Sequence, residues 1–197
     1  MLSIWYFDGD LYYNLYSNFI AQIEASIPKT TDVAQIPAYL YDKNQQNRYR
    51  LWTNSKTVVH NYGTELELRY ILNKHYSLTG NGSYQTLQRT NENDGLEDGF
   101  NTPRWIVNGG IYGNDVYKKL GFNVTLKYQS SYYWQSFLVN GNVPSVFNAD
   151  CMLHYTFSKG IDIKLGASNV LNKYYYSILG GPQIGGLYYT TFTYSIK

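Results

Sequence analysis

The chain has 197 residues, enough for one domain or for a sheet that closes on itself. Its net charge of +2 is too small to indicate nucleic acid or another polyanion as a partner. Charged residues make up only 15%, while aromatic residues reach 18% and include 23 tyrosines. Because tyrosine joins an apolar ring to a polar tip, this composition favours β structure at a boundary between apolar and wet surroundings.

The N-terminal quarter contains two kinds of pattern. Residues 1–24 alternate between apolar and polar, which predicts one long strand, or two strands that break near Asp8 and Gly9. Over residues 25–51 the alternation lapses, and two prolines and the polar run DKNQQNR appear. This segment is predicted to be a long loop.

Four alternating segments follow and are predicted to be strands. They cover residues 61–72, 76–85, 104–112 and 120–128. Tight turns are predicted after the first and third of them, at residues 73–74 and 113–115. The second and fourth end in long polar loops, and the later loop carries three adjacent aromatic residues.

The last three predicted strands cover residues 146–157, 161–176 and 187–196. The middle one shows the clearest alternation, with Ile163 and Leu165 on one face and Asp162 and Lys164 on the other. A tight turn at residues 158–160 precedes it, and a glycine-rich loop follows it.

About eight strands with alternating short and long connections are typical of transmembrane β-barrels. A closed barrel satisfies every backbone hydrogen-bonding group, which lipid requires. Two aromatic girdles are predicted, one beside the short turns and one nearer the long loops. Their members are Tyr76, Tyr117 and Phe157, and Trp105, Tyr128, Tyr174 and Tyr188. The predicted fold is all-β, an antiparallel up-and-down transmembrane β-barrel, with the eight strands forming part of a larger barrel.

The polar faces of these strands carry charges of both signs. The residues predicted to face the lumen are Glu65, Glu67, Arg69, Lys127, Asp150, Asp162 and Lys164. Burying an unpaired charge in a core without water costs free energy, so these residues are consistent with a water-filled lumen. The alternative at this point is a soluble β-sandwich whose charged face lies outside.

No catalytic or metal-binding pattern is found. His60, His75 and His154 have no partner at metal-site spacing, and Glu65 with Glu67 is explained by alternating lumenal charges. The single cysteine, Cys151, cannot form an internal disulfide and falls on an apolar face. We therefore expect no enzyme activity, metal site or cofactor.

Three segments together resemble one family. They are residues 10–24 (DLYYNLYSNFIAQIE), 61–84 (NYGTELELRYILNKHYSLTGNGSY) and 167–175 (ASNVLNKYY). In order and spacing they are similar to the C-terminal third of a TonB-dependent outer-membrane receptor, particularly the Bacteroidetes type. The resemblance implies nutrient uptake across the outer membrane of a Gram-negative bacterium, with outer-membrane lipid around the barrel.

The family also has an N-terminal plug domain, a TonB-contacting box and a barrel of about 22 strands. None of these additional parts is recognised in residues 1–197, so we expect a C-terminal barrel fragment that does not transport alone. TonB would act only through the missing plug. The resemblance places an unknown small nutrient among the loops, where the candidate contacts are Trp52, Tyr132, Tyr133 and Trp134.

Two other functions stay open on the sequence. A stand-alone eight-stranded outer-membrane barrel with a structural or adhesin role predicts that the first strand pairs with the eighth. A soluble carbohydrate-binding β-sandwich, using tyrosine and tryptophan, predicts a stable monomer without detergent.

Overall fold

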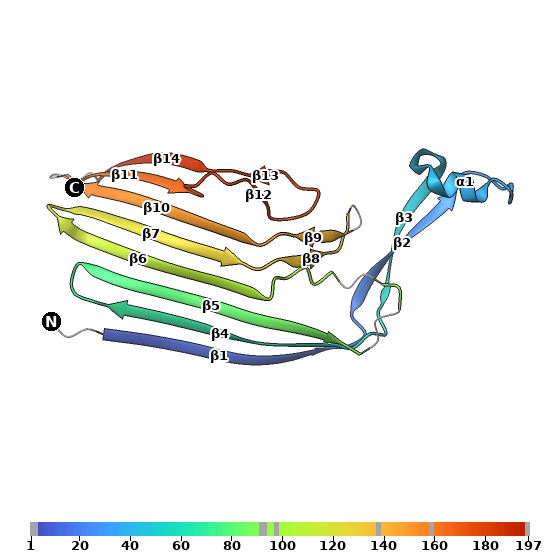
Figure 1. Cartoon of the computed structure of the whole chain (residues 1–197), viewed down its shortest axis with the longest axis horizontal. Helices are drawn as coiled ribbons and strands as arrows, with labels where there is room; N and C mark the ends of the chain where they lie inside the picture. Colours follow the sequence, from blue (N-terminus) through green and yellow to red (C-terminus); the bar gives the residue numbers. More distant parts are fainter. Residues whose placement is uncertain (1–3, 91–93, 97–98, 137–138, 158–159, 196–197) are drawn as a thin grey trace.

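The protein is represented by a computed structural model, which describes residues 4–90, 94–96, 99–136, 139–157 and 160–195. Its main feature is one antiparallel sheet of eight strands (Figure 1). From edge to edge the strands are β1 (Ile4–Tyr16), β4 (Val59–Ile71), β5 (Tyr76–Arg89), β6 (Trp105–Tyr117), β7 (Leu120–Gln129), β10 (Val146–Thr156), β11 (Ile161–Ser168) and β14 (Leu187–Tyr194). This spatial order is also the chain order, which confirms the predicted up-and-down topology.

The strand register separates the two kinds of side chain. On β4, Leu68 lies opposite Phe7 of β1, whereas the adjacent Glu67 lies opposite Asp8. All the strands continue this alternation, which gives the sheet one apolar face and one polar face. A slip of one residue would exchange the faces, so the alternation itself specifies the register.

The sheet has a single layer and almost no core. Among the described residues, the buried apolar side chains are Ala21, Val59, Val143 and Ala167. The apolar face is open, and Leu11 is 87% exposed. The solvent-accessible area is 13684 Å², against about 9,600 Å² for a compact globular protein of this mass. A β-sandwich would cover this face with a second sheet, so the sandwich alternative is wrong for the described residues.

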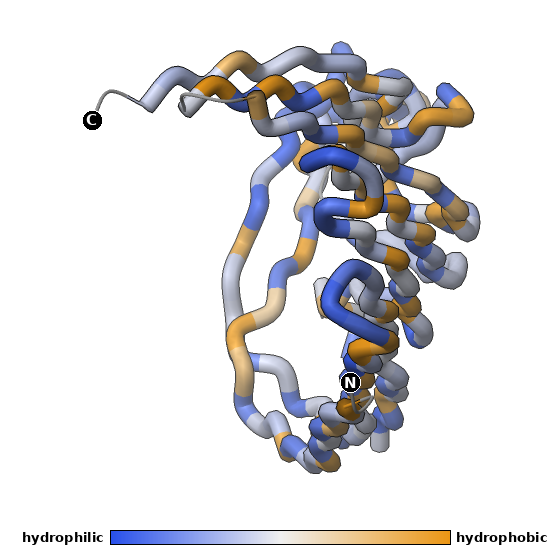
Figure 2. Tube along the Cα trace, turned by 90° about the vertical axis from the view of Figure 1, so that its left-hand side faces the viewer, coloured by the Kyte–Doolittle hydropathy of each residue, from blue (hydrophilic) through white to orange (hydrophobic). Residues whose placement is uncertain are grey.

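The sheet curves but does not close. Seen nearly along the strands, it follows an open arc (Figure 2). β1 and β14 stand at the two ends of the strand order and do not pair with each other in the described ranges. The stand-alone barrel predicted this pairing, and the prediction is wrong. Both edges therefore present unpaired backbone N–H and C=O groups.

Aromatic residues lie towards both ends of the apolar face. On four strands, two of them are eight residues apart: Trp5 and Tyr13, Tyr62 and Tyr70, Tyr76 and Tyr84, and Phe147 and Tyr155. Eight residues of antiparallel strand span about 27 Å, close to the roughly 25 Å apolar band of outer-membrane barrels. The rings also contact one another across strands, with centroids of Tyr84 and Trp105 4.5 Å apart.

For the N-terminal strand, both the predicted end near residue 24 and the predicted break near Asp8 and Gly9 are wrong. β1 runs through Asp8 and Gly9 without a break and ends at Tyr16. The break comes later, where Asn18 has a positive φ of 52° before β2 (Ile20–Pro28) begins. Asparagine tolerates this conformation better than most residues because its short side chain can hydrogen-bond locally.

The segment predicted as a long loop is mostly ordered. β2 pairs with β3 (Gln46–Asn54), and α1 (Ile36–Tyr41) and the 3-10 helix η1 (Lys43–Gln45) lie at the tip of this ribbon. Figure 1 shows the ribbon projecting beyond the end of the sheet. Its strands are largely solvated, so burial imposed too little alternation to reveal them. No described helix has the length and apolarity to cross a membrane.

Two further predicted strand ends, those of β11 and β6, are wrong because asparagine and lysine residues adopt positive φ there. β11 ends at Ser168 rather than Tyr176, because Asn169 and Asn172 adopt φ of 50° and 48°. β6 continues past a bulge, and the turn is made by Lys118 and Lys119, both with positive φ. The turn predicted at residues 158–160 lies partly outside the described residues.

The other long connections also contain short hairpins. β8 (Tyr132–Trp134) pairs with β9 (Gly141–Val143), and β12 (Tyr175–Tyr176) pairs with β13 (Gln183–Ile184). Figure 1 places both at the same end of the sheet as the β2–β3 ribbon. The predicted alternation of short and long connections is thus confirmed, and the long ones are partly structured.

Candidate functional site

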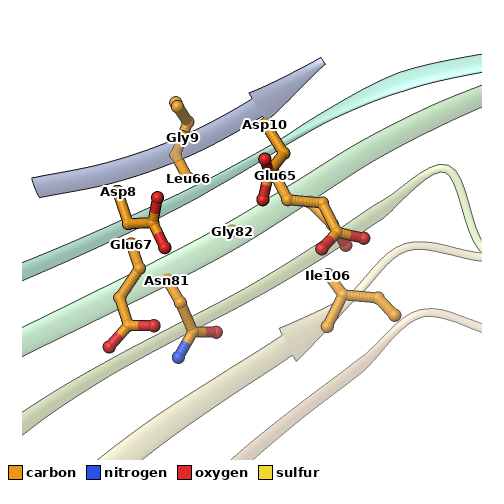
Figure 3. A pocket seen from close by; sticks show the side chains of 10 residues that line it. Asp8, Gly9, Asp10, Glu65, Leu66, Glu67, Asn81, Gly82 and Ile106 are labelled. Carbon is orange, nitrogen blue, oxygen red and sulfur yellow. The ribbon is translucent and has the colours of Figure 1, made fainter. Parts of the chain in front are cut away.

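An acidic groove, lined by Asp8, Asp10, Glu65 and Glu67, runs along β1 and β4 on the polar face. Asp8 lies directly opposite Glu67, and Asp10 lies directly opposite Glu65. Figure 3 shows the four carboxylates on one side of the sheet, around a cavity of about 400 Å³. Like charges directly opposite each other destabilise a strand pair. The four carboxylates therefore give the groove a negative charge, which favours cations.

The groove does not have the geometry of a metal centre. Within the described ranges, no three His, Cys, Asp or Glu side chains are arranged to hold a metal ion. Arg69 follows Glu67 on the same face of β4, but among the described residues it forms no ion pair with either glutamate.

A paired network lies further along the polar face. The Lys127 ammonium on β7 donates to one carboxylate oxygen of Asp150 on β10. The other oxygen accepts from Ser168 Oγ at 3.0 Å and from the Asn169 N–H at 2.8 Å. Asp150 thereby connects β7, β10 and the end of β11. Here the polar face satisfies its own charges, unlike in the acidic groove.

The seven residues predicted to face the lumen share one face. The pairing registers place them all on the polar side of the sheet: Glu65, Glu67, Arg69, Lys127, Asp150, Asp162 and Lys164. They do not form one cluster, because they are spread over β4, β7, β10 and β11. The sequence prediction did not single out Asp8 and Asp10, although their alternation on β1 was a usable signal.

A carboxylate fixes one long connection against another. Asp94 accepts hydrogen bonds from the hydroxyl groups of Ser55 and Thr57 and from the backbone N–H of Leu96. Both hydroxyl-bearing side chains are buried, with 3% and 5% exposed. The hydrogen bond from Ser55 is the main reason that the pKa of Asp94 lies below its ordinary value. The sequence showed only a polar loop here.

The structure separates the four aromatic residues predicted to contact a ligand. Tyr132, Tyr133 and Trp134 form β8, whereas Trp52 lies on β3 beneath the Arg50 guanidinium, 5.9 Å from the ring centroid. Tyr132 donates to the Ser177 carbonyl at 2.8 Å, and burial raises its pKa. The ring of Tyr133 is 59% exposed and lines a second cavity on the polar face.

A single-layer antiparallel sheet with one apolar face, aromatic rows near its ends and structured long connections is the wall of a transmembrane β-barrel. The family model described as "TonB dependent receptor-like, beta-barrel" matches residues 2–170. The chain belongs to this family of receptor barrels. The predicted resemblance is confirmed at family level.

Solved structures give the same fold. The copper transporter OprC matches with a TM-score of 0.67 at 11% identity, over 98% of this chain. The siderophore receptor PirA from Acinetobacter baumannii matches with a TM-score of 0.62 at 16% identity, over 96% of this chain. The FrpB iron transporter from Neisseria meningitidis matches with a TM-score of 0.62 at 14% identity, over 95% of this chain.

The chain spans only 29% of OprC, 30% of PirA and 29% of FrpB. At these identities the likeness concerns the fold alone. The comparison with curated proteins found no match.

Proposed function

We propose that this chain forms a section of the barrel wall of a TonB-dependent receptor in the outer membrane of a Gram-negative bacterium. The whole receptor takes up a scarce nutrient, and this section does not transport alone. The remaining barrel strands pair with the free edges of β1 and β14. TonB acts through a plug domain inside the completed barrel.

The observation that carries this proposal is the exposed apolar face. Side chains such as Phe7, Leu66 and Leu165 are 49–73% exposed although they are apolar. Contiguous apolar area of this extent is rare on soluble proteins. In the proposal, lipid tails cover it, and the aromatic rows meet the two membrane interfaces.

The polar face then lines the interior of the receptor. The seven predicted lumenal residues and the acidic groove face the plug or water there, where charges keep their hydration. The long connections lie on the extracellular side, since outer-membrane barrels have short periplasmic turns and longer extracellular loops. The candidate ligand contacts Trp52, Tyr132, Tyr133 and Trp134 all belong to segments at that end (Figure 1).

The nutrient class is proposed from the neighbours. Their names describe a copper transporter, siderophore receptors and an iron transporter. They support a metal ion or a metal chelate as the cargo of the whole receptor.

Site-directed spin labelling along β11 tests the proposal. Cys151 is first replaced by alanine, and a nitroxide is then attached at each position from Asp162 to Ala167 in protein isolated in outer membranes. We expect oxygen, which concentrates in lipid, to reach labels at positions 163, 165 and 167. A water-soluble nickel chelate should reach labels at positions 162, 164 and 166.

Accessibility of the labelled positions to both reagents without a period of two would reject the proposal. Labels at Val33 and Tyr41, in the described tip of the β2–β3 ribbon, provide the control. The nickel chelate should reach both of them.

A further inference from the structure

The long connections at one end of the sheet are folded separately (Figure 1). The β2–β3 ribbon, the β8–β9 hairpin and the β12–β13 hairpin are three two-stranded sheets, and within the described residues none of them pairs with another or with the main sheet. Side chains must therefore hold them together. Two further segments matter here: the ribbon base, residues 17–19 and 55–58 on either side of the ribbon, and the strap, residues 94–96 and 99–104 between β5 and β6.

On one side the strap is fixed to the ribbon base. Asp94 accepts hydrogen bonds from the hydroxyl group of Ser55 and, at 3.0 Å, from that of Thr57. Both hydroxyl-bearing residues are buried, and a hydrogen bond is stronger where water is excluded. The ring of Phe100 lies 5.8 Å from the ring of Phe19. The Ser55 N–H also donates to the Phe19 carbonyl at 2.8 Å, so the two parts of the ribbon base are joined to each other.

On the other side one asparagine joins the strap to the β8–β9 hairpin. Asn101 Nδ2 donates to the Gln135 carbonyl at 2.8 Å, and the Gln135 N–H donates to Asn101 Oδ1 at 2.7 Å. The side-chain amide thus pairs with the backbone as a neighbouring strand would. The backbone of Asn101 has a φ of 40°, which asparagine tolerates better than most residues. This position therefore uses both the side chain and the backbone properties of asparagine.

The β8–β9 hairpin in turn contacts the β12–β13 hairpin. Tyr132 Oη donates at 2.8 Å to the carbonyl of Ser177, which lies between β12 and β13. A Cβ atom added at Gly180 would lie 3.2 Å from Val139 Cγ1, so the two hairpins also pack closely there. The contacts thus form a series that runs from the ribbon base through the strap to both hairpins.

From this series we infer that the strap couples the ribbon base to the two hairpins, so that the long connections move as one unit. Asp94 and Asn101 transmit the movement, because they link segments that no described strand pairing joins. Such coupling through hydrogen-bonded side chains is a free energy that can be measured. The inference rests on the proposed function for one point only, that the long connections lie outside the cell, where their movement changes access to the barrel.

Double electron–electron resonance on the protein in outer membranes tests the coupling. Cys151 is replaced by alanine, and nitroxide labels are attached at two exposed positions, Ile20 beside the ribbon base and Ile184 in β13. A linked unit predicts a distance distribution as narrow as that between labels at Leu66 and Leu153 in the main sheet. This comparison needs no further variant and therefore survives a folding failure. A clearly wider distribution between positions 20 and 184 would overturn the inference.

Two variants then break the series at different points. Asp94→Ala and Asn101→Gly should each broaden the distribution between positions 20 and 184, and glycine is chosen because it adopts a positive φ without strain. Because a series is lost when any one link is cut, the double variant should be no broader than the broader single variant. The matched control is Asn108→Ala, which removes a 2.8 Å hydrogen bond to Asn81 within the main sheet and should leave the distribution unchanged. If either single variant fails to broaden the distribution, if the two effects add, or if the control broadens it equally, the inference is overturned.

The two proposals fail in different ways. Protein that shows the period-two labelling on β11 but a wide distribution between positions 20 and 184 loses the coupling and keeps the receptor function. A narrow distribution that both variants broaden, in protein without the period-two labelling, keeps the coupling and rejects the receptor function.

Discussion

The two faces of β4 carry neighbouring residues with opposite requirements. Leu66 and Leu68 lie on the apolar face and are 49% and 40% exposed, whereas Glu65 and Glu67 lie on the polar face beside two aspartates. No second layer of this chain covers either face within the described residues. The apolar face needs a solvent without hydrogen bonds, and the acidic groove needs water, cations or a basic partner. One strand can satisfy both only at a boundary between lipid and an aqueous interior.

The polar face is not uniform either. Around Asp150 the charges are paired within the chain, but in the acidic groove like charges face each other. The paired network joins three strands of the sheet, whereas the four carboxylates of the groove have no cationic partner among the described residues. The following predictions test these differences, from the largest expected effect to the smallest.

The largest effect is expected on the apolar face. Leu66→Arg places a charge near the middle of β4, and arginine at the bilayer midplane costs about 2–4 kcal/mol in outer-membrane barrels. The free energy of unfolding is measured by urea titration in lipid vesicles, followed by tryptophan fluorescence. Ser83→Arg is the control, because Ser83 lies on the polar face opposite Glu65 and the change should cost little. Equal losses for both variants would contradict the assignment of the faces.

The next effect is expected in the paired network. Asp150→Ala removes the acceptor for Lys127, Ser168 and the Asn169 N–H, so we expect a loss of about 2–3 kcal/mol. Thermal unfolding in detergent gives the value. The control is Lys164→Ala, an exposed charge on the same face, whose loss should stay below about 0.5 kcal/mol. A result in which both variants lose the same amount would show that the network adds nothing.

A smaller effect is expected at the anchor between the connections. Asp94→Ala removes the carboxylate that accepts from the buried hydroxyl groups of Ser55 and Thr57, at a cost of about 1–2 kcal/mol. Because the folded pKa of Asp94 is lowered, its charged form stabilises the protein above the ordinary value near 3.8. That contribution is lost as the pH falls below this value through the lower folded pKa.

Chemical unfolding at pH 7 and at pH 3 measures this difference. The gap between the unmodified protein and Asp94→Ala should shrink at the lower pH. Asp32→Ala, between β2 and β3, removes a carboxylate that, among the described residues, accepts only from the N–H of Ala34 in its own turn. Asp32→Ala should lose less free energy of unfolding at pH 7 than Asp94→Ala. If the difference between the unmodified protein and Asp94→Ala grows as the pH falls, the role of the Asp94 charge is refuted.

The smallest effect, and the only stabilising one, is expected in the acidic groove. Glu67→Gln removes the like-charge pair with Asp8 and should stabilise the sheet by about 0.2–1 kcal/mol. Added salt should stabilise the unmodified protein more than the variant, because salt screens the repulsion. Both effects are read from unfolding curves at low and high salt. Glu24→Gln, which breaks an ion pair with Arg48 instead, should not be stabilising.

The sequence alone determined the regular part of this protein. In a strand with one apolar and one polar face, successive residues point alternately to the two faces. The alternation therefore predicted the eight main strands, their order and the faces of Glu65, Lys127 and Asp162. The family followed from the same segments. The β2–β3 ribbon could not be predicted, because strands that are solvated on both faces need no alternation of apolar and polar residues. The early end of β11 could not be predicted either, because the sequence does not show which asparagines, such as Asn18 and Asn169, adopt a positive φ.

Only the tertiary structure decided which distant residues meet. Strand pairing set Asp8 against Glu67, and the packing of three separate segments placed Arg89, Arg104 and Tyr133 around one cavity. It also decided that the eight strands leave both edges open, because closure depends on the curvature and stagger of the whole sheet and not on the pattern within any strand. Local alternation specifies faces, whereas sites and closure depend on contacts between segments far apart in the chain.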